Sequence, residues 1–313
     1  MGHRLRMIAK SVRDLVGNTP LYEITSFDLP AGTRILAKLE WMNPGGSVKD
    51  RLGIQLVDAA IEQGYVTRGG TIIEPTAGNT GIGLALAAKK YDLQVICVVP
   101  EKFSQEKQTL MRALGATVVN TPTELDMQGA IDKAKELGQT IPNSYVPLQF
   151  ENEENPVTYQ RTLGPELMAE LDQIDWFVAG CGSGGTFAGT AAYLKERLGT
   201  KGAIVEPEGS VLNGGPAGPH KTEGIGTAKW PSLVSRDLVD EIHTISDHDA
   251  FTKVHELAAR EGLLVGSSAG AALVAALDLA HRFPGSTIVT VFADSAERYL
   301  SQQIFEKVDE THA

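Results

Sequence analysis

Short apolar segments typical of buried strands alternate with helical patterns along most of the 313 residues. Apolar, β-rich runs predict strands at residues 71–74, 94–99, 116–120, 176–180, 203–206 and 288–292. Apolar positions at helical spacing predict helices at residues 81–90, 104–114, 127–137, 157–171, 186–197 and 271–279. Helices between consecutive apolar strands imply parallel sheets with right-handed crossovers. The pattern therefore predicts a doubly wound α/β fold.

Length and one local change in composition predict two domains. A chain of 313 residues is too long for one small core. A polar, acidic stretch at residues 149–155 interrupts the alternation of strands and helices. We expect a smaller α/β domain at residues 43–150 and a larger one formed by residues 1–42 and 151–313. Ligands of such folds bind beyond the carboxyl ends of the strands, often in the cleft between domains.

Composition narrows the possible partners. The net charge of −11 repels phosphate backbones, so we expect no nucleic-acid partner. Cys97 and Cys181 lie in apolar, strand-like segments, which favours buried thiols in a reducing cytoplasm over a disulfide. No Cys/His set has metal-ligand spacing, residues 1–10 lack the apolar core of a signal peptide, and no apolar stretch is long enough to span a bilayer. We therefore expect a cytoplasmic protein without a metal site or a membrane contact.

One lysine follows a glycine turn and opens a helix. Residues 43–51 read Asn-Pro-Gly-Gly-Ser-Val-Lys-Asp-Arg, and the apolar residues after them repeat at helical spacing. Ser47 is expected as the N-cap, which puts Lys49 in the first turn. An ammonium group is unfavourable beside the positive end of a helix dipole, whereas a neutral amine or an imine is suited to that place. The alternative is an ordinary surface lysine near a helix start.

Three loops between strands and helices could bind a ligand. The loop at 76–81 offers hydroxyls, an amide and backbone N–H groups to a carboxylate, or it is a tight turn that needs its glycines for shape alone. The loop at 182–186, Gly-Ser-Gly-Gly-Thr, suits one terminal phosphate and matches neither a Walker loop nor the dinucleotide spacing. The loop at 266–270 is either a serine-capped helix start or a place where Ser268 bonds a heterocycle. Together with Lys49, these loops describe a pyridoxal phosphate site.

The chain resembles the pyridoxal-phosphate enzymes of the β-replacement group, which includes cysteine synthase and the catalytic core of cystathionine β-synthase. The resemblance runs from Gly17-Asn18-Thr19-Pro20-Leu21 to Glu297-Arg298-Tyr299-Leu300-Ser301 and carries the motifs in the family order. It implies the fold type II architecture, with the cofactor in the cleft between two doubly wound domains. It also implies a homodimer and small amino-acid substrates.

The resemblance implies a role for each motif. Lys49 would hold the cofactor as a Schiff base and later remove the α-proton of the substrate. Asn79 would bond the 3′-oxygen of the cofactor ring, and Ser268 the pyridine nitrogen. The cofactor phosphate would be held by Gly182, Ser183, Gly184, Gly185 and Thr186. The substrate would be bound by Thr76, Ala77, Gly78, Asn79, Thr80, Gln149, Glu223 and Gly224.

Several details resemble one branch of the family. Ala77 stands where cysteine synthase usually has serine, and Glu223 where it usually has glutamine. Segments 207–210 and 294–295 look like cystathionine β-synthase, whereas segments 213–215, 218–221 and 297–301 look like cysteine synthase. This mixture is similar to bacterial enzymes that make cystathionine from O-acetylserine and homocysteine. Glu223 would then read the amino group of homocysteine, or it is a structural carboxylate that caps its turn.

Other functions remain as alternatives to this one. Cysteine synthase, which uses sulfide as the acceptor, is the alternative within the family. A serine or threonine dehydratase has a different lysine motif. A nucleotide-binding oxidoreductase lacks its third glycine spacing and its acidic ribose partner in this sequence. A non-catalytic sensor that binds the cofactor or a metabolite would have no use for an intact Lys49.

Overall fold

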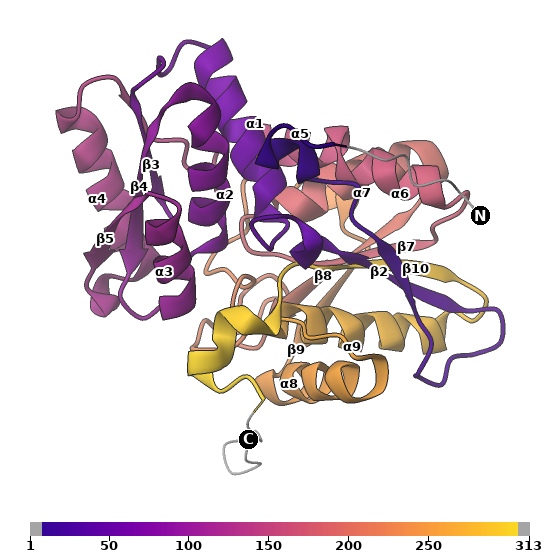
Figure 1. Cartoon of the computed structure of the whole chain (residues 1–313). Coiled ribbons are helices and arrows are strands. Elements are labelled where there is room, and N and C mark those ends of the chain that lie inside the picture. The colour runs from indigo at the N-terminus through magenta and orange to yellow at the C-terminus, as the bar shows by residue number, and fades with distance from the viewer. Residues whose placement is uncertain (1–7, 306–313) are drawn as a thin grey trace.

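The computed structural model describes residues 8–305, and its strands form two sheets (Figure 1). The larger sheet has six strands in the order β1-β2-β10-β7-β8-β9, and the smaller has four in the order β5-β4-β3-β6. Every pairing is parallel except that of β1 with β2. The predicted doubly wound α/β fold is confirmed by these sheets and by the helices that cover both faces of each.

The larger sheet joins the start of the described chain to its second half. Its strands are β1 (Leu21–Ile24), β2 (Arg34–Leu39), β7 (Trp176–Gly180), β8 (Lys201–Pro207), β9 (Glu241–Ile245) and β10 (Thr287–Phe292). Helices α5 (Glu154–Arg161), α6 (Leu163–Glu170) and α7 (Gly185–Leu198) cover one face. Helices α8 (Asp247–Glu256) and α9 (Ser267–Arg282) cover the other.

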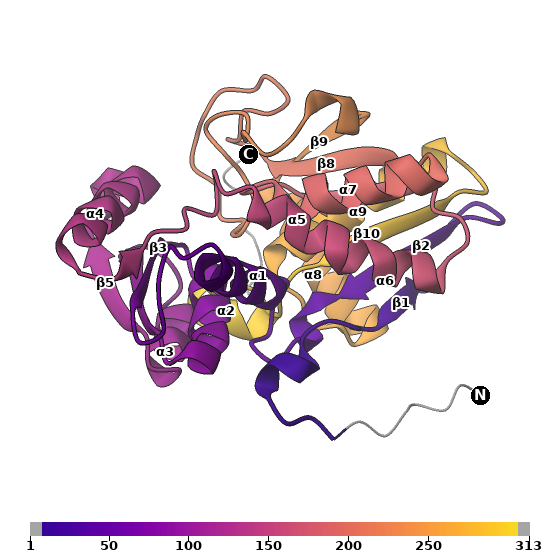
Figure 2. The ribbon, with the colours of Figure 1, turned by 90° about the horizontal axis from the view of Figure 1, so that it is seen from above.

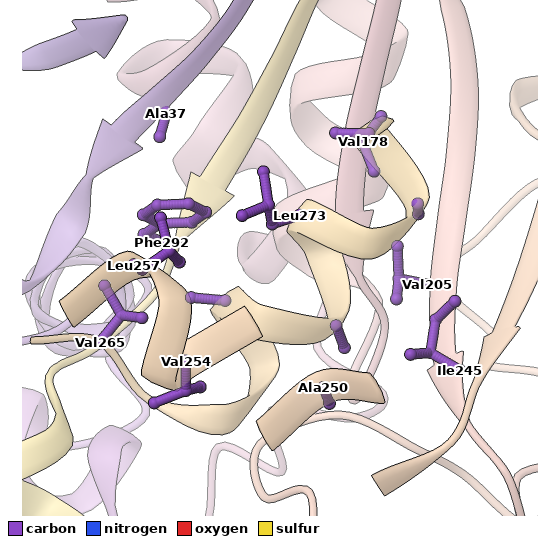
Figure 3. Close-up of a cluster of buried hydrophobic side chains, with 14 of the residues drawn as sticks. Ala37, Val178, Val205, Ile245, Ala250, Val254, Leu257, Val265, Leu273 and Phe292 are labelled. Atoms are coloured by element: carbon purple, nitrogen blue, oxygen red, sulfur yellow. The ribbon is translucent and has the colours of Figure 1, made fainter. Parts of the chain in front are cut away.

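The core between α8, α9 and the larger sheet is closely packed with apolar side chains (Figure 3). Val254 on α8 and Leu273 on α9 are completely buried against Val178 and Phe292 of the sheet. Burying such side chains is the main favourable term in folding, at about 25 cal/mol per Å² of apolar surface. This core fixes the carboxyl ends of β7 and β10, which the glycine loop and Asp294 follow.

The smaller sheet lies in the middle of the sequence and at one end of the molecule (Figure 2). Its strands are β3 (Thr71–Pro75), β4 (Gln94–Pro100), β5 (Thr117–Thr121) and β6 (Ser144–Tyr145). Helices α1 (Lys49–Glu62), α2 (Asn79–Ala88) and α3 (Gln105–Ala113) pack toward one face, and α4 (Asp126–Thr140) covers the other. The segment that forms the smaller sheet thus lies between β2 and β7 in the sequence, although both of those strands belong to the larger sheet.

Helices α1 and α2 cross at two glycines. A Cβ on Gly53 would lie 2.2 Å from the backbone carbon of Gly83, and a Cβ on Gly83 would lie 2.4 Å from the carbonyl oxygen of Lys49. Only glycines allow this approach, because any side chain at either position would collide with backbone atoms. The crossing brings the first turn of α1, which carries Lys49, beside α2, which begins at Asn79.

Two local predictions were wrong. The single helix expected at 157–171 is two helices, because Thr162 leaves the helical conformation with φ −124° and ψ −72°. Pro165 follows in the first turn of α6, where a residue without an N–H is tolerated. The N-cap of α1 is Val48 and not the expected Ser47. The Ser47 hydroxyl nevertheless accepts the Lys49 N–H at 3.2 Å.

Within residues 8–305, no helix has both the length and the apolar character needed to cross a membrane.

Candidate active site

Lys49 is the first residue of α1 and lies in a largely buried environment. Burial lowers its pKa to about 8, against the opposing effects of the nearby Asp294 and Cys181. Among residues 8–305, its amine has neither a hydrogen bond nor an ion pair. An unpaired amine whose neutral form is accessible near physiological pH can act as a nucleophile or a base. The predicted first-turn position is confirmed, and the surface-lysine alternative does not fit this burial.

The loop at 76–80 is shaped by one glycine and held by one glutamine. Gly78 has φ +144°, which side chains rarely adopt, and its N–H bonds the Thr76 hydroxyl at 2.9 Å. The Thr80 hydroxyl donates to the Gln149 side chain at 2.8 Å. Thr76, Thr80 and Gln149, which sequence reasoning assigned to one carboxylate site, are thus in one region, while Ala77 adds no polar group.

Asn79 is held from both sides of its amide. Its Nδ2 donates to Asp294 Oδ2 at 2.6 Å, and its Oδ1 accepts from Arg298 Nη1 at 2.9 Å. Tyr299 donates to the same Asp294 oxygen at 2.6 Å, and Asp294 Oδ1 is buried without a hydrogen-bond partner among the described residues. The two contacts fix which way the amide points, so one Nδ2 hydrogen has a defined direction for a ligand.

The loop at 182–186 can only be built from small residues. Gly184 has φ +84°, and a Cβ on it would lie 2.4 Å from Val234 Cγ2. A Cβ on Gly185 would lie 1.8 Å from Asn155 Oδ1. Gly185 is also the first residue of α7, so the backbone N–H groups of this loop lie at a helix N-terminus. Such a terminus carries roughly half a positive charge and suits an anion.

One hydroxyl of this loop, that of Ser183, is connected through Asn155 to Gln149, the residue that holds the carboxylate loop. Asn155 Nδ2 donates to Ser183 Oγ at 3.0 Å and to the Gln149 carbonyl at 2.7 Å. The buried hydroxyl of Thr186 has no hydrogen-bond partner among residues 8–305. A buried hydroxyl without a partner is costly, so a ligand oxygen would satisfy it.

Ser268 lies in the first turn of α9, and the serine-capping alternative is wrong. The N-cap is Gly266, so no serine occupies that position. The hydroxyl of Ser267 instead accepts the N–H of Glu223 at 3.2 Å. Ser268 Oγ has no hydrogen bond among the described residues and remains available to a ligand. Gly224, the residue after Glu223, has φ +84°, and its carbonyl oxygen would lie 2.8 Å from a Cβ on Gly182.

Glu223 is the predicted site residue whose surroundings differ most from expectation. Its carboxylate pairs with Lys107 Nζ at 2.8 Å and accepts a hydrogen bond from Gln302. Among residues 8–305, its side chain accepts no backbone N–H, so the alternative of a carboxylate that caps its turn does not fit. Its partner Lys107 comes from α3 and was not predicted from the sequence.

Sequence reasoning missed several residues that shape the site: Glu74, Lys107, Asn155, Asp294, Arg298 and Tyr299. Two of them carried a signal. Glu74 is a charged residue inside an apolar strand, and Asp294 follows the carboxyl end of a buried strand, where ligands of such folds bind. The others act through contacts between residues far apart in the chain, which no local pattern predicts.

Comparison with known proteins identifies the family. A family described as "Pyridoxal-phosphate dependent enzyme" matches residues 12–294. The chain belongs to this family. The predicted cofactor, pyridoxal phosphate, and the predicted fold type II architecture are confirmed by this membership. The oxidoreductase alternative is thereby set aside, and the protein is a pyridoxal-phosphate dependent enzyme.

Three relatives illustrate the similarity. The chain is 56% identical over 302 residues to an O-acetylserine dependent cystathionine beta-synthase of Bacillus subtilis, covering 96% of this chain and 98% of that one. It is 55% identical over 304 residues to a cysteine synthase of Helicobacter pylori, covering 96% and 99%. The crystal structure of an O-acetylserine dependent cystathionine beta-synthase from Helicobacter pylori superposes with a TM-score of 0.93, at 55% identity, covering 96% of this chain and 100% of that chain.

The residues of this site fit pyridoxal phosphate. Its aldehyde needs a lysine amine, and Lys49 has one without a partner in the described chain. Its phosphate needs N–H donors and hydroxyls, which the loop at 182–186 and the orphaned Thr186 hydroxyl supply. Its ring needs polar contacts at two places, for which the fixed amide of Asn79 and the free Ser268 hydroxyl are suited.

Proposed function

We propose that this enzyme replaces the acetate of O-acetyl-L-serine by the thiol of L-homocysteine, giving L-cystathionine and acetate. The unpaired, largely buried Lys49 amine, beside a carboxylate loop and a phosphate loop, is the observation that carries the proposal. The names of the Bacillus and Helicobacter relatives support the choice of donor and acceptor. In this reaction a Cβ–O bond breaks, acetate leaves with the electron pair, and a Cβ–S bond forms as the thiol proton is released.

Each predicted residue other than Glu223, which is discussed below, has a place in this proposal. Lys49 would hold the cofactor through Nζ. The phosphate would lie against Gly182, Ser183, Gly184, Gly185 and Thr186. The ring would contact Asn79 and Ser268, and the carboxylate of O-acetylserine would bind Thr76, Gly78, Asn79, Thr80 and Gln149. Ala77 and Gly224 would leave room beside the reacting carbon.

The proton transfers follow from the surroundings of Lys49. When bound, the cofactor supplies the electron sink that makes the hydrogen on the substrate Cα acidic. Lys49 Nζ would take that hydrogen, since burial brings its pKa to about 8 and makes the neutral amine accessible. Thr80 and Gln149 would hold the substrate carboxylate so that the Cα–H bond faces Lys49. Their buried positions would also exclude water from the reacting carbon.

Steady-state kinetics with O-acetylserine and either homocysteine or sulfide test the proposal. Homocysteine is expected to give cystathionine, detected by mass spectrometry, with the higher kcat/KM. A much higher kcat/KM with sulfide, together with no cystathionine from homocysteine, would make the acceptor assignment wrong. Serine in place of O-acetylserine, in the same assay, reports on the leaving group.

Cysteine synthase is the second candidate function. One of the two Helicobacter relatives, the protein that is 55% identical over 304 residues, is named cysteine synthase, which favours sulfide as an acceptor. The two functions share the donor, the lysine and the phosphate loop, and they differ only in whether the site recognises the amino-acid part of the incoming thiol. The acceptor comparison above therefore separates them in a single experiment.

We also propose the domain boundaries, the assembly and the location of the enzyme. All four strands of the smaller sheet lie between Thr71 and Tyr145, which supports a domain at 43–150 inserted into a larger one at 1–42 and 151–313. The family resemblance supports a homodimer, which sedimentation equilibrium tests. The free, buried thiols of Cys97 and Cys181 fit a reducing cytoplasm, which fractionation of cells tests.

A further inference from the structure

Lys107 is a buried charge that the proposed chemistry does not use. It lies in the first turn of α3, and only 2% of its surface is exposed. Its Nζ pairs with Glu223 Oε2 at 2.8 Å, lies 3.1 Å from the Tyr299 hydroxyl, and is 4.2 Å from the centroid of the Tyr299 ring. Lysine is almost never buried without a reason of this kind.

The ion pair of Lys107 and Glu223 lies between two of the predicted binding loops, the carboxylate loop at 76–81 and the loop at 266–270. The aliphatic part of Lys107 covers Gly78 of the carboxylate loop so closely that a Cβ on Gly78 would lie 2.3 Å from Lys107 Cδ. On the other side, the backbone N–H of Glu223 bonds Ser267, which precedes Ser268. Lys107 comes from the unit of the smaller sheet and Glu223 from a loop that follows β8 of the larger sheet. The pair thus spans the region where a second substrate would approach the first.

A buried ion pair is a poor source of stability, because removing two charges from water costs about as much as their attraction returns. A ligand that carries both charges could replace the pair at little cost, since every charge would keep a partner. Homocysteine has an ammonium and a carboxylate on one carbon, two methylenes from its sulfur. Sulfide has neither group.

We propose that Lys107 and Glu223 form the recognition site for the amino-acid head of the acceptor thiol. Lys107 Nζ binds the acceptor carboxylate, Glu223 binds its ammonium group, and in the free enzyme the two side chains satisfy each other. Tyr299 and Gln302 keep a contact with Lys107 and Glu223, respectively, during the exchange. This inference rests on the proposed use of homocysteine and on the predicted role of Glu223, and it adds Lys107 as the group that binds the acceptor carboxylate.

Truncated acceptors test the site. The acceptors are homocysteine, 4-mercaptobutyrate, which lacks the amino group, 3-mercaptopropylamine, which lacks the carboxylate, and sulfide. In the unaltered holoenzyme, each truncated thiol is expected to have a kcat/KM at least about tenfold below that of homocysteine, as for the loss of one charged hydrogen bond. Glu223→Gln should remove the preference for the amino group and keep that for the carboxylate. Lys107→Gln should do the reverse.

Sulfide is the internal control, because it has no head group to recognise. The ratio of kcat/KM for homocysteine to that for sulfide should fall at least about tenfold in both variants. All values should stay within about threefold for Lys133→Gln, which removes an exposed lysine paired with Glu136. The double variant Lys107→Glu with Glu223→Lys keeps an ion pair if either single variant folds poorly. Its ratio of kcat/KM for homocysteine to that for sulfide should fall in the same way.

Two results would overturn the inference. If both variants lose sulfide and homocysteine turnover equally, the pair only closes the region and reads no substrate. If both keep their selectivity among the thiols, the head group is recognised elsewhere. An unaltered enzyme that makes no cystathionine would instead contradict the proposed function, and with it any site for homocysteine. The first two results leave cystathionine formation by the unaltered enzyme intact, which separates them from the third.

Discussion

Lys49 is the residue on which the chemistry depends, and its replacement should separate cofactor attachment from folding. Lys49→Ala should abolish covalent attachment and lower kcat by about a thousandfold or more, because both the nucleophile and the base are lost. The measurement is peptide mass spectrometry after borohydride reduction, together with the visible absorbance of the enzyme. Lys90→Ala, an exposed lysine near Asp58, is the matched control. A reduced adduct that persists in Lys49→Ala would assign the role to another lysine.

Asp294 positions Asn79 and gives a second prediction at this scale. Asp294→Asn weakens the contact that directs the Asn79 amide, because a neutral amide accepts the Nδ2 hydrogen less strongly than a carboxylate does. We expect the dissociation constant of pyridoxal phosphate to rise about tenfold and the absorption maximum of the bound cofactor to shift.

The Asp294 prediction needs a readout that a general loss of stability would not move. The absorption maximum is that readout, because it reports contacts to the cofactor ring. Asp278→Asn, at an exposed carboxylate that pairs with Arg282, is the control. An unchanged maximum with reduced thermal stability would mean that Asp294 only supports the fold.

The elements themselves were largely predictable, and the failures have physical causes. Buried parallel strands such as β7 have a continuous apolar signature, so their positions follow from the sequence. Strands β1, β2, β6 and β9 were not predicted. Strands β1 and β9 each have only one buried residue and mix polar with apolar side chains, β6 has only two residues, and β2 carries the buried Lys38 among its apolar side chains. The break between α5 and α6 lies next to Gly164, where a Cβ would be 2.7 Å from the ring of Tyr193, a contact between separate helices that no local pattern predicts.

The residues of the site likewise divide into those that the sequence predicts and those that it does not. Residues at the carboxyl ends of strands, such as Gly182 and Asn79, were predictable, since parallel strands direct those loops to one edge. The partners of these residues were not, because Lys107, Arg298 and Asp294 reach the site from separate parts of the chain. A single sequence carries no record of which of its charged residues will meet in space.

Strand β3 carries a buried carboxyl that should make stability depend on pH. Glu74 accepts the backbone N–H groups of Leu148 and Gln149, each at 2.9 Å, and so holds the segment that carries Gln149. Burial nevertheless raises the Glu74 pKa to about 8, although these two hydrogen bonds lower it. The folded protein therefore keeps a proton that the unfolded chain loses near its ordinary value of 4.5.

Stability should then fall as the pH rises between about 4.5 and about 8, by at most about 1.4 kcal/mol per pH unit for this group. Glu74→Gln cannot titrate and should lack this part of the pH dependence. At pH 5 it should be about 1–3 kcal/mol less stable, because its amide opposes one of the two N–H donors, and the deficit should shrink toward pH 8. Urea unfolding at several pH values measures this, with the exposed Glu101→Gln as control. A deficit that stays constant with pH would contradict the assignment.

At the scale of the whole molecule, a buried charge network joins α1 to the larger sheet. Arg51 bonds Glu40, which follows β2, through Nε at 2.7 Å, and Glu166 on α6 through Nη1 at 2.6 Å. Lys38 pairs with Glu166 at 2.9 Å. Because Arg51 lies two residues after Lys49, this network fixes the lysine relative to the glycine loop that follows β7. The network therefore couples the packing of the two sheets to the geometry of the reaction.

Arg51→Met should cost about 3–5 kcal/mol, because it leaves the completely buried Glu40 carboxylate without its cation. Adding Glu40→Gln removes that uncompensated charge, while Lys38 still pairs with Glu166, so the double variant should recover at least half of the loss. Its kcat/KM should nevertheless stay below that of the unaltered enzyme, because α1 has lost the bidentate contact to α6 that orients Lys49. Urea unfolding and steady-state kinetics of the three proteins test both parts. Recovery of kcat/KM in step with stability would show that the network supports folding alone.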